Sequence, residues 1–227
     1  MPTPHSSRLT TLLAAIIVSA CATNPAPKSS SVMPPPSEPI DPTYVAKARA
    51  DSMRLPYTEK DVEFMSHMIG HHAQAIAMSR WAPTHGAGPA VQRLADRIIN
   101  AQQDEISIMQ HWLRDRLKPV PEATPNGTKM TMGGMEHVML MPGMLTEAKM
   151  KELDAARGPE FDRLFLTYMI QHHKGAVSMV KDLFSTYGAG QDETVFKFAS
   201  DVNVDQTTEI ARMEKMLAAI SLGITVE

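Results

Sequence analysis

The sequence is poor in three things that often reveal a protein's class. Its single cysteine excludes both a disulfide framework and a multi-cysteine zinc site within the chain. Six Phe, four Tyr and two Trp in 227 residues, with a moderate β-branched content, disfavour an all-β fold. The 22 basic and 25 acidic residues leave a formal net charge of −3, which argues against electrostatic binding of nucleic acid. Methionine and histidine, by contrast, are plentiful, with 18 and nine residues.

Residues 1–20 are predicted to be a signal peptide. Arg8 precedes an apolar run that ends at Val18. The run is shorter than the ~20 residues that a membrane-spanning helix needs, and it fits the apolar region of an export signal. The small residues before Cys21 resemble the lipobox of bacterial lipoproteins, in which that cysteine is acylated. The alternative is an ordinary secretory peptide with an unmodified Cys21.

In either case we expect an exported protein of the cell envelope that faces the periplasm. The lipobox reading predicts contact with a membrane through a lipid anchor only, and Ala22 after the cysteine favours the outer membrane. The rest of 21–57 is rich in Pro and Ser, which is typical of an extended tether rather than a folded core. The folded domain is expected over 58–227.

That domain contains one sequence unit twice. The segment FMSHMIGHHAQAIAM at 64–78 aligns with FLTYMIQHHKGAVSM at 165–179, and 94–113 aligns with 198–217. Each copy reads as a pair of helices, so the sequence predicts an all-α fold, a ferritin-like four-helix bundle made of two helical hairpins. We expect repeat one over 58–117, a Met-rich connecting loop over 118–157 and repeat two over 158–220.

The expected helix ends rest on local signals. Thr58 followed by Asp61 resembles a capping box, and Gly158-Pro159 places proline at a first helical position. Thr146 is expected to cap a short helix within the connecting segment.

The polar residues on the apolar helix faces suggest a metal site. Both repeats carry a His-His pair, with Met three residues before the first His and seven residues after it. A lone histidine on such a face is usually a hydrogen-bonded core residue, and Met there is usually core filler. The repeated arrangement favours metal ligation instead. The candidate ligands are Met68, His71, His72, Met78, Met169, His172, His173, Met179, His67, Met109 and Met213.

Further polar residues of both repeats also point inward. We expect Glu105 and Glu209 to orient the histidines by hydrogen bonds rather than to bind metal directly. Gln102 and Gln206 lie on the same stripes, and Asp61 and Asp162 are expected to be hydrogen-bond partners or helix caps.

Thioether sulfur is a soft ligand that suits Cu(I) and Ag(I), and imidazole suits copper in both oxidation states. The donor set therefore favours copper, with Cu(I) preferred and Ag(I) as its expected mimic. The connecting loop adds six Met and one His within fifteen residues, which a solvated loop has no packing reason to hold. The alternative is a hydrophobic strap across the bundle. The possible loop ligands are Met130, Met132, Met135, His137, Met139, Met141 and Met144.

Residues 58–217 resemble the domain of unknown function 305 family, through FMSHMIGHHAQAIAM, the stripe of Gln102, Glu105 and Met109, and a long segment at 141–180. The resemblance implies a ferritin-like fold and, as for some exported members, copper binding and copper resistance. It supports the paired His and the Met of both repeats as ligands. Tyr168 replaces His67 in repeat two, so the second site is poorer in ligands.

Three functions remain open at this point. The first is a copper-binding protein that sequesters or transfers the ion and catalyses nothing. The second is a ferritin-like di-iron or copper oxidase, although no Glu in the chain has a His three residues later, as the di-iron motif needs. The third is a structural or partner-binding lipoprotein. No protein partner can be identified from the sequence.

Overall fold

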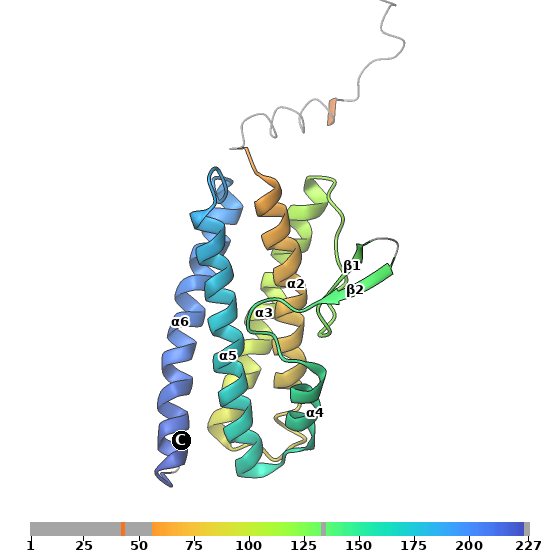
Figure 1. Ribbon diagram of the computed structural model, residues 1–227. Coiled ribbons are helices and arrows are strands. Elements are labelled where there is room, and N and C mark those ends of the chain that lie inside the picture. The colour runs from red at the N-terminus through yellow and green to blue at the C-terminus, as the bar shows by residue number, and fades with distance from the viewer. Residues whose placement is uncertain (1–41, 44–55, 133–134, 225–227) are drawn as a thin grey trace, which may run out of the picture. The chain divides into compact units, whose positions relative to one another are not determined.

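The computed structural model describes residues 42–43, 56–132 and 135–224, and it describes the backbone alone for 128–132 and 135–138. Four long helices form the predicted bundle (Figure 1). They pair in sequence order, and the two hairpins meet along α2 and α5. The helices are α2 (Glu59–Arg80), α3 (Pro89–Asp115), α5 (Gly158–Ser185) and α6 (Glu193–Ser221).

The connecting segment is more ordered than the loop that the sequence predicted. It contains an antiparallel pair of strands, β1 (Thr128–Met132) and β2 (Met135–Met139), followed by the short helix α4 (Glu147–Ala155). Both strands are short runs with β-prone Thr or Val on either side of a Gly-Gly dipeptide, which is a known hairpin signal. The sequence predicted an irregular loop here because the segment is rich in Met and Gly. Thr146 caps α4 as expected.

Two aspartates lock the ends of the hairpins reciprocally. Thr58 and Asp61 form the predicted capping box at the start of α2, and Asp61 Oδ1 also accepts a hydrogen bond from the backbone of Gly190 at 2.7 Å. In the other direction, Asp162 near the start of α5 accepts from the backbone of Gly88 at 3.0 Å. Each repeat therefore fastens the interhelical turn of the other, which preserves the twofold relation between them.

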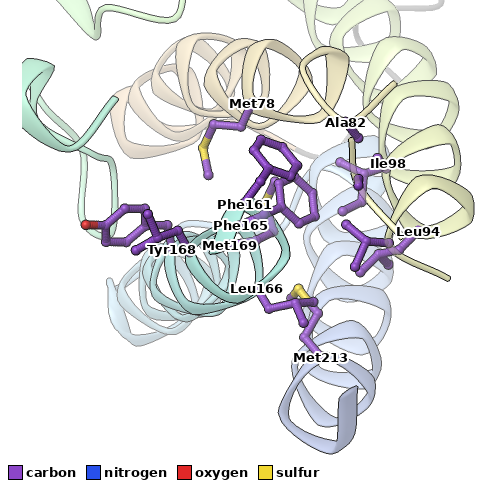
Figure 2. Close-up of a cluster of buried hydrophobic side chains, with 14 of the residues drawn as sticks. Met78, Ala82, Leu94, Ile98, Phe161, Phe165, Leu166, Tyr168, Met169 and Met213 are labelled. Atoms are coloured by element: carbon purple, nitrogen blue, oxygen red, sulfur yellow. The ribbon is translucent and has the colours of Figure 1, made fainter. Parts of the chain in front are cut away.

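The core consists of two clusters of apolar side chains along the bundle. One contains Met78, Met169 and Met213, which pack among aromatic and aliphatic side chains such as Phe161 and Phe165 (Figure 2). The other contains Met68, Met109, Met141, Met144 and Met179. Most of the candidate Met ligands are therefore buried, and Met65 and Met216 are buried as well.

The N-terminus of α6 is fixed by a buried carboxylate. Asp192 caps α6 by accepting from the backbone of Thr194 and Val195, and it also accepts from the indole of Trp112 at 2.9 Å. Arg116 contacts its second oxygen. Burial alone would raise the pKa of Asp192, but the hydrogen bonds from Trp112, Val195 and Arg116 outweigh burial and lower it. The residue thus joins α3 to α6 across the two repeats.

The predicted signal peptide (1–20), Cys21 and most of the predicted tether (21–57) lie outside the described residues. Among the residues that are described, no helix has both the length and the apolar character needed to cross a membrane.

Replacing Asp192 with Ala is expected to lower the free energy of unfolding by about 2–4 kcal/mol, because a helix cap is lost and the Trp112 indole is left unpaired in the interior. Asp201→Ala is the control, since this exposed residue of α6 forms an exposed ion pair with Lys197 four residues away and should change stability by no more than about 0.5 kcal/mol. Urea denaturation measures both, and equal effects would contradict the assigned role.

Candidate functional site

Four histidines form a row through the middle of the bundle. His71 and His72 on α2 and His172 and His173 on α5 all have side chains with no exposed surface. The rings of His71 and His172, one from each repeat, lie against each other with centroids 3.8 Å apart and planes tilted by 40°. The ring of His72 lies 6.3 Å from His71, and that of His173 lies 6.2 Å from His172. The structure therefore brings the two predicted His-His pairs together at the interface between the hairpins.

A glutamate stands at each end of this row. His173 Nε2 donates to Glu209 Oε2 at 2.7 Å. In the other repeat, His72 Nε2 lies 2.7 Å from Glu105 Oε2, in an orientation less favourable for a hydrogen bond. Each pair joins the two helices of one hairpin. Both glutamates therefore lie beside histidines, as the sequence predicted.

The inner pair of histidines is held in the neutral form. Burial, followed by the nearby charge of His72, lowers the pKa of His71 to about 3. Burial and the neighbouring histidines also place the pKa of His172 well below its ordinary value. Neutral imidazole is the form that binds metal ions, so one nitrogen of each of these rings keeps a free lone pair near pH 7.

Several ring nitrogens of the row have no hydrogen-bond partner within the described residues. A carbonyl can only accept, so His71 Nε2 must donate to Pro142 O at 3.0 Å, which leaves a lone pair on Nδ1. His71 Nδ1, His173 Nδ1 and both nitrogens of His172 are buried without a partner. Unpaired buried acceptors are unfavourable. These atoms therefore fit a metal ion better than they fit a purely structural core.

The segment 140–145, here called the strap, runs from β2 to α4 (Figure 1). Its backbone reaches the histidine row at His71, whose Nε2 lies 3.0 Å from Pro142 O. Gln74 on α2 holds the strap through Nε2, which donates to Leu145 O, and Oε1, which accepts from Leu145 N at 2.7 Å. On α5, Gly175 touches its backbone so closely that an added Cβ would lie 1.9 Å from Pro142 O. The strap thus closes the histidine row from this side.

A pocket of about 280 Å³ opens beside the strap and brings together four of the candidate ligands. His67 on α2 and Met179 on α5 line it together with Met139 and Met141. Burial lowers the pKa of His67, whose Nδ1 lies 3.8 Å from Glu63 Oε1.

The backbone of the strap links this pocket to the histidine row. Pro142 lines the pocket, and its carbonyl is the acceptor for His71. At the edge of the pocket, Lys60 Nζ lies 2.5 Å from Asp182 Oδ2 and joins α2 to α5. Three thioethers and an imidazole in one pocket form a donor set that suits a soft monovalent cation.

The corresponding position of the other repeat is closed by a different contact. Tyr168, which replaces His67, hydrogen-bonds to Glu152 of α4, and this bond and burial raise its pKa to about 12. Figure 2 shows its hydroxyl pointing away from the apolar cluster. Met78, the equivalent of Met179, has no exposed surface. The two repeats therefore present unequal ligand sets.

In the described part of the chain, no three His, Cys, Asp or Glu side chains stand together in an arrangement that would hold a metal ion. A site among these residues would therefore need other ligands as well, such as methionine sulfur, amide oxygen or water. The side chains of Met130, Met132, Met135 and His137 lie outside the described residues, so their part in ligation stays a prediction.

Sequence reasoning missed the residues that hold the strap. Gly70 and Gln74 of repeat one align with Gln171 and Gly175 of repeat two, so glycine and glutamine exchange places. Both glutamines hydrogen-bond the strap, since Gln171 Nε2 donates to Gly143 O at 3.0 Å. This exchange of glycine and glutamine could have indicated the crossing segment from the sequence. Two equivalent helices that are crossed by one segment must differ at the positions that contact it.

A four-helix bundle of two related hairpins, with paired histidines at their interface, defines a distinct class of helical protein. The profile of the Domain of unknown function (DUF305) family matches residues 61–217. The chain belongs to this family.

Known proteins of the same kind agree with the assignment. An uncharacterised protein of Acanthamoeba polyphaga mimivirus is 39% identical over 56 residues, which is 25% of this chain and 37% of the viral protein. A DUF305 protein of Streptomyces coelicolor, described as a candidate secreted protein, is 29% identical with a TM-score of 0.60, over 74% of this chain and 96% of that one.

A third similar structure is that of CopM in its Cu(I)-bound form. It is 28% identical with a TM-score of 0.52, over 71% of this chain and 96% of CopM. CopM is also known in Cu(II)-bound and Ag-bound forms, which resemble this chain to a similar degree.

Acid is expected to destabilise the protein from about pH 6.5 downward. The unfolded chain takes up protons on His71 and His172 below their ordinary pKa near 6.5, whereas folded His71 does so only near pH 3. The free energy of unfolding should therefore fall by up to about 1.4 kcal/mol per pH unit for each histidine. Urea denaturation between pH 7.5 and 5 measures the slope, and a flat profile would contradict the neutral state assigned to the pair.

Gly175→Ala is expected to destabilise the protein by about 1–3 kcal/mol, because the new methyl group would overlap the strap backbone at Pro142 and Gly143. In an open helix the same change would stabilise by about 1 kcal/mol. The sign of the change in Tm is thus the test. Lys174→Ala, at the exposed neighbouring position, is the control, and a higher Tm for Gly175→Ala would show that the strap does not lie there.

Proposed function

We propose that this protein binds copper in the cell envelope and sequesters or transfers the ion, and so supports copper tolerance. The observation that carries the proposal is the pocket in which His67, Met139, Met141 and Met179 meet. Thioether sulfur binds Cu(I) and Ag(I) well but binds Zn²⁺ or Mg²⁺ poorly. The similarity to CopM, whose structures contain Cu(I), Cu(II) or Ag, supports the same chemistry for this chain.

Copper here is cargo, so the first site must exchange ligands with solvent or with another protein. The four buried histidines are closed to solvent, whereas Met139 is 41% exposed and His67 is partly exposed. We therefore assign capture to the pocket. The uncharged thioethers keep Cu(I) without the desolvation cost of a thiolate, and they are not consumed by disulfide formation outside the cytoplasm.

The histidine row provides a second, deeper position for the ion. The lone pair on His71 Nδ1 and the unpartnered nitrogens of His172 are neutral and buried beneath the strap. Imidazole accepts Cu(I) and Cu(II), so these rings extend the donor set to the oxidised ion. Glu209 accepts a hydrogen bond from His173 and so fixes the tautomer of that ring, and Glu105 lies against His72 at the other end of the row.

The protein is proposed to act as a carrier rather than as an enzyme. Each histidine–glutamate pair joins two helices, and no Glu-x-x-His motif supplies the carboxylates of a di-iron centre. The predicted export signal and the candidate lipobox support the proposal that this carrier is an envelope lipoprotein, acylated at Cys21 and facing the periplasm from the outer membrane. The similarity to the candidate secreted protein of Streptomyces coelicolor supports export.

A competitive Cu(I) titration under anaerobic, reducing conditions tests the proposal with three variants. Met141→Leu with Met179→Leu removes two sulfurs from the pocket at nearly constant volume. His71→Gln with His172→Gln removes the inner rings. Met130→Leu with Met132→Leu removes two methionines of β1. Met65→Leu, which replaces a buried methionine outside the pocket, is the control.

We expect tight binding of Cu(I) that falls by about tenfold or more in the pocket variant and stays unchanged in the control. At a hundredfold excess over Kd, Cu(I) should add about 2.7 kcal/mol to the free energy of unfolding. Binding lost only in the β1 variant would move capture to the hairpin, and binding lost only in the histidine variant would move it to the row. Absence of binding to the unaltered protein would refute the proposed function.

A further inference from the structure

A second cavity, of about 270 Å³, lies between α3 and α6, and its lining has carboxylate, amide and hydroxyl groups beside the apolar Ile98 and Ala101 but no sulfur. Gln102 and Glu105 face it from α3, and Asp205, Gln206 and Glu209 face it from α6. Arg97 of α3 is the positive side chain in the lining. Three carboxylates against one guanidinium leave the cavity with an excess of negative charge.

The carboxylates of this cavity interact with one another. Burial and then the charges of Glu105, Asp201 and Glu209 raise the pKa of Asp205. Asp205 has no ion-pair or hydrogen-bond partner within the described residues. A cation would relieve this repulsion.

The amide groups in the lining are a separate sign of a missing ligand. Gln102 and Gln206 are each only 3% exposed. Within the described residues, Gln102 Oε1 and both amide atoms of Gln206 have no hydrogen-bond partner. Buried amides are almost always paired with protein or ordered water. Water held around an ion in the cavity would supply both the donors and the acceptors that these amides need.

The histidine row holds Glu105 and Glu209 on the side away from the cavity. Their Oε2 atoms lie 2.7 Å from His72 and His173, respectively. No hydrogen bond involves either Oε1 atom within the described residues, so one oxygen of each carboxylate is left for the cavity. The histidine row thus positions a pair of carboxylates across the gap between α3 and α6.

We propose that this cavity is a site for a hydrated, oxygen-preferring divalent cation, of the class of Mg²⁺, Ca²⁺ and Mn²⁺. Such ions are held by carboxylate and amide oxygens, and Mg²⁺ in particular keeps several water ligands. Because a water molecule occupies about 30 Å³, the cavity accommodates an ion with most of its hydration shell. Water ligands are required, since no three acidic or histidine side chains of the described residues converge on one point.

The site is chemically distinct from the Met/His pocket and does not depend on copper binding. No methionine lines it, so a soft ion gains nothing there. Within the described residues, the histidine row links the two sites, since its outer rings contact Glu105 and Glu209 and one of its inner rings, His71, contacts Pro142.

Titration of the full chain with Mn²⁺, followed by the electron paramagnetic resonance signal of the free ion, tests the proposal. Glu105→Gln with Glu209→Gln removes both charges but keeps hydrogen-bonding groups beside the histidines. Asp205→Asn is the second variant, and it disturbs no hydrogen bond or ion pair of the described residues. Asp104→Asn, which removes the same charge from the position next to Glu105 but outside the lining, is the control.

We expect one Mn²⁺ per chain, displaced by Mg²⁺ or Ca²⁺, with affinity reduced about tenfold or more in both test variants and unchanged in the control. Asp205→Asn should not lower Tm in cation-free buffer, because it removes a repelled carboxylate. If the double variant does not fold, the comparison of Mn²⁺ affinity between Asp205→Asn and Asp104→Asn tests the site.

Two results would overturn the site: no Mn²⁺ bound at millimolar concentration, or binding that is the same in Asp205→Asn and the unaltered protein. A Cu(I) titration of Asp205→Asn separates the two proposals. It should match the unaltered protein, so failure of the cation site leaves the copper assignment as it stands.

Discussion

Four imidazole rings buried at the interface of two helical hairpins are the constraint on which the rest of the structure depends. A polar group in an apolar core is unfavourable unless it is paired or neutral, and both solutions occur here. The outer rings lie against Glu105 and Glu209, and the inner rings, His71 and His172, are neutral. Each end of the histidine row thus contacts a carboxylate. At its centre, ring nitrogens of His71 and His172 have no hydrogen-bond partner within the described residues.

The repeated architecture follows from this interface. Both hairpins supply a ring at the centre and a glutamate at the periphery, and the reciprocal bonds from Asp61 to Gly190 and from Asp162 to Gly88 keep the hairpins in register. With the ends fixed, the positions of the rings at the centre are fixed as well. The structure thus holds in place a set of side chains that would otherwise favour solvent.

The parts of this structure that repeat in the sequence were predictable, and the parts that break the repeat were not. The four helices, the cap at Thr58 and the His-His pairs follow from local spacing. A strap across the bundle was one of the two alternatives for the connecting segment, but its contacts with His71 and Gln74 were not predictable, because they join residues 71 positions apart. Asp205 was not predicted as a site residue either, because repeat one has Ala101 at the aligned position and the repeat therefore gave no indication of it.

The unequal sites of the two repeats are a consequence of geometry. A single segment that crosses a twofold interface can contact it in only one direction, so the equivalent positions of the repeats receive different neighbours. His67 and Met179 meet the start of the strap and remain in an open pocket, whereas Tyr168 meets Glu152 of α4 and Met78 is enclosed. One of the two equivalent faces therefore keeps its soft donors accessible, and the segment that connects the repeats determines which face that is.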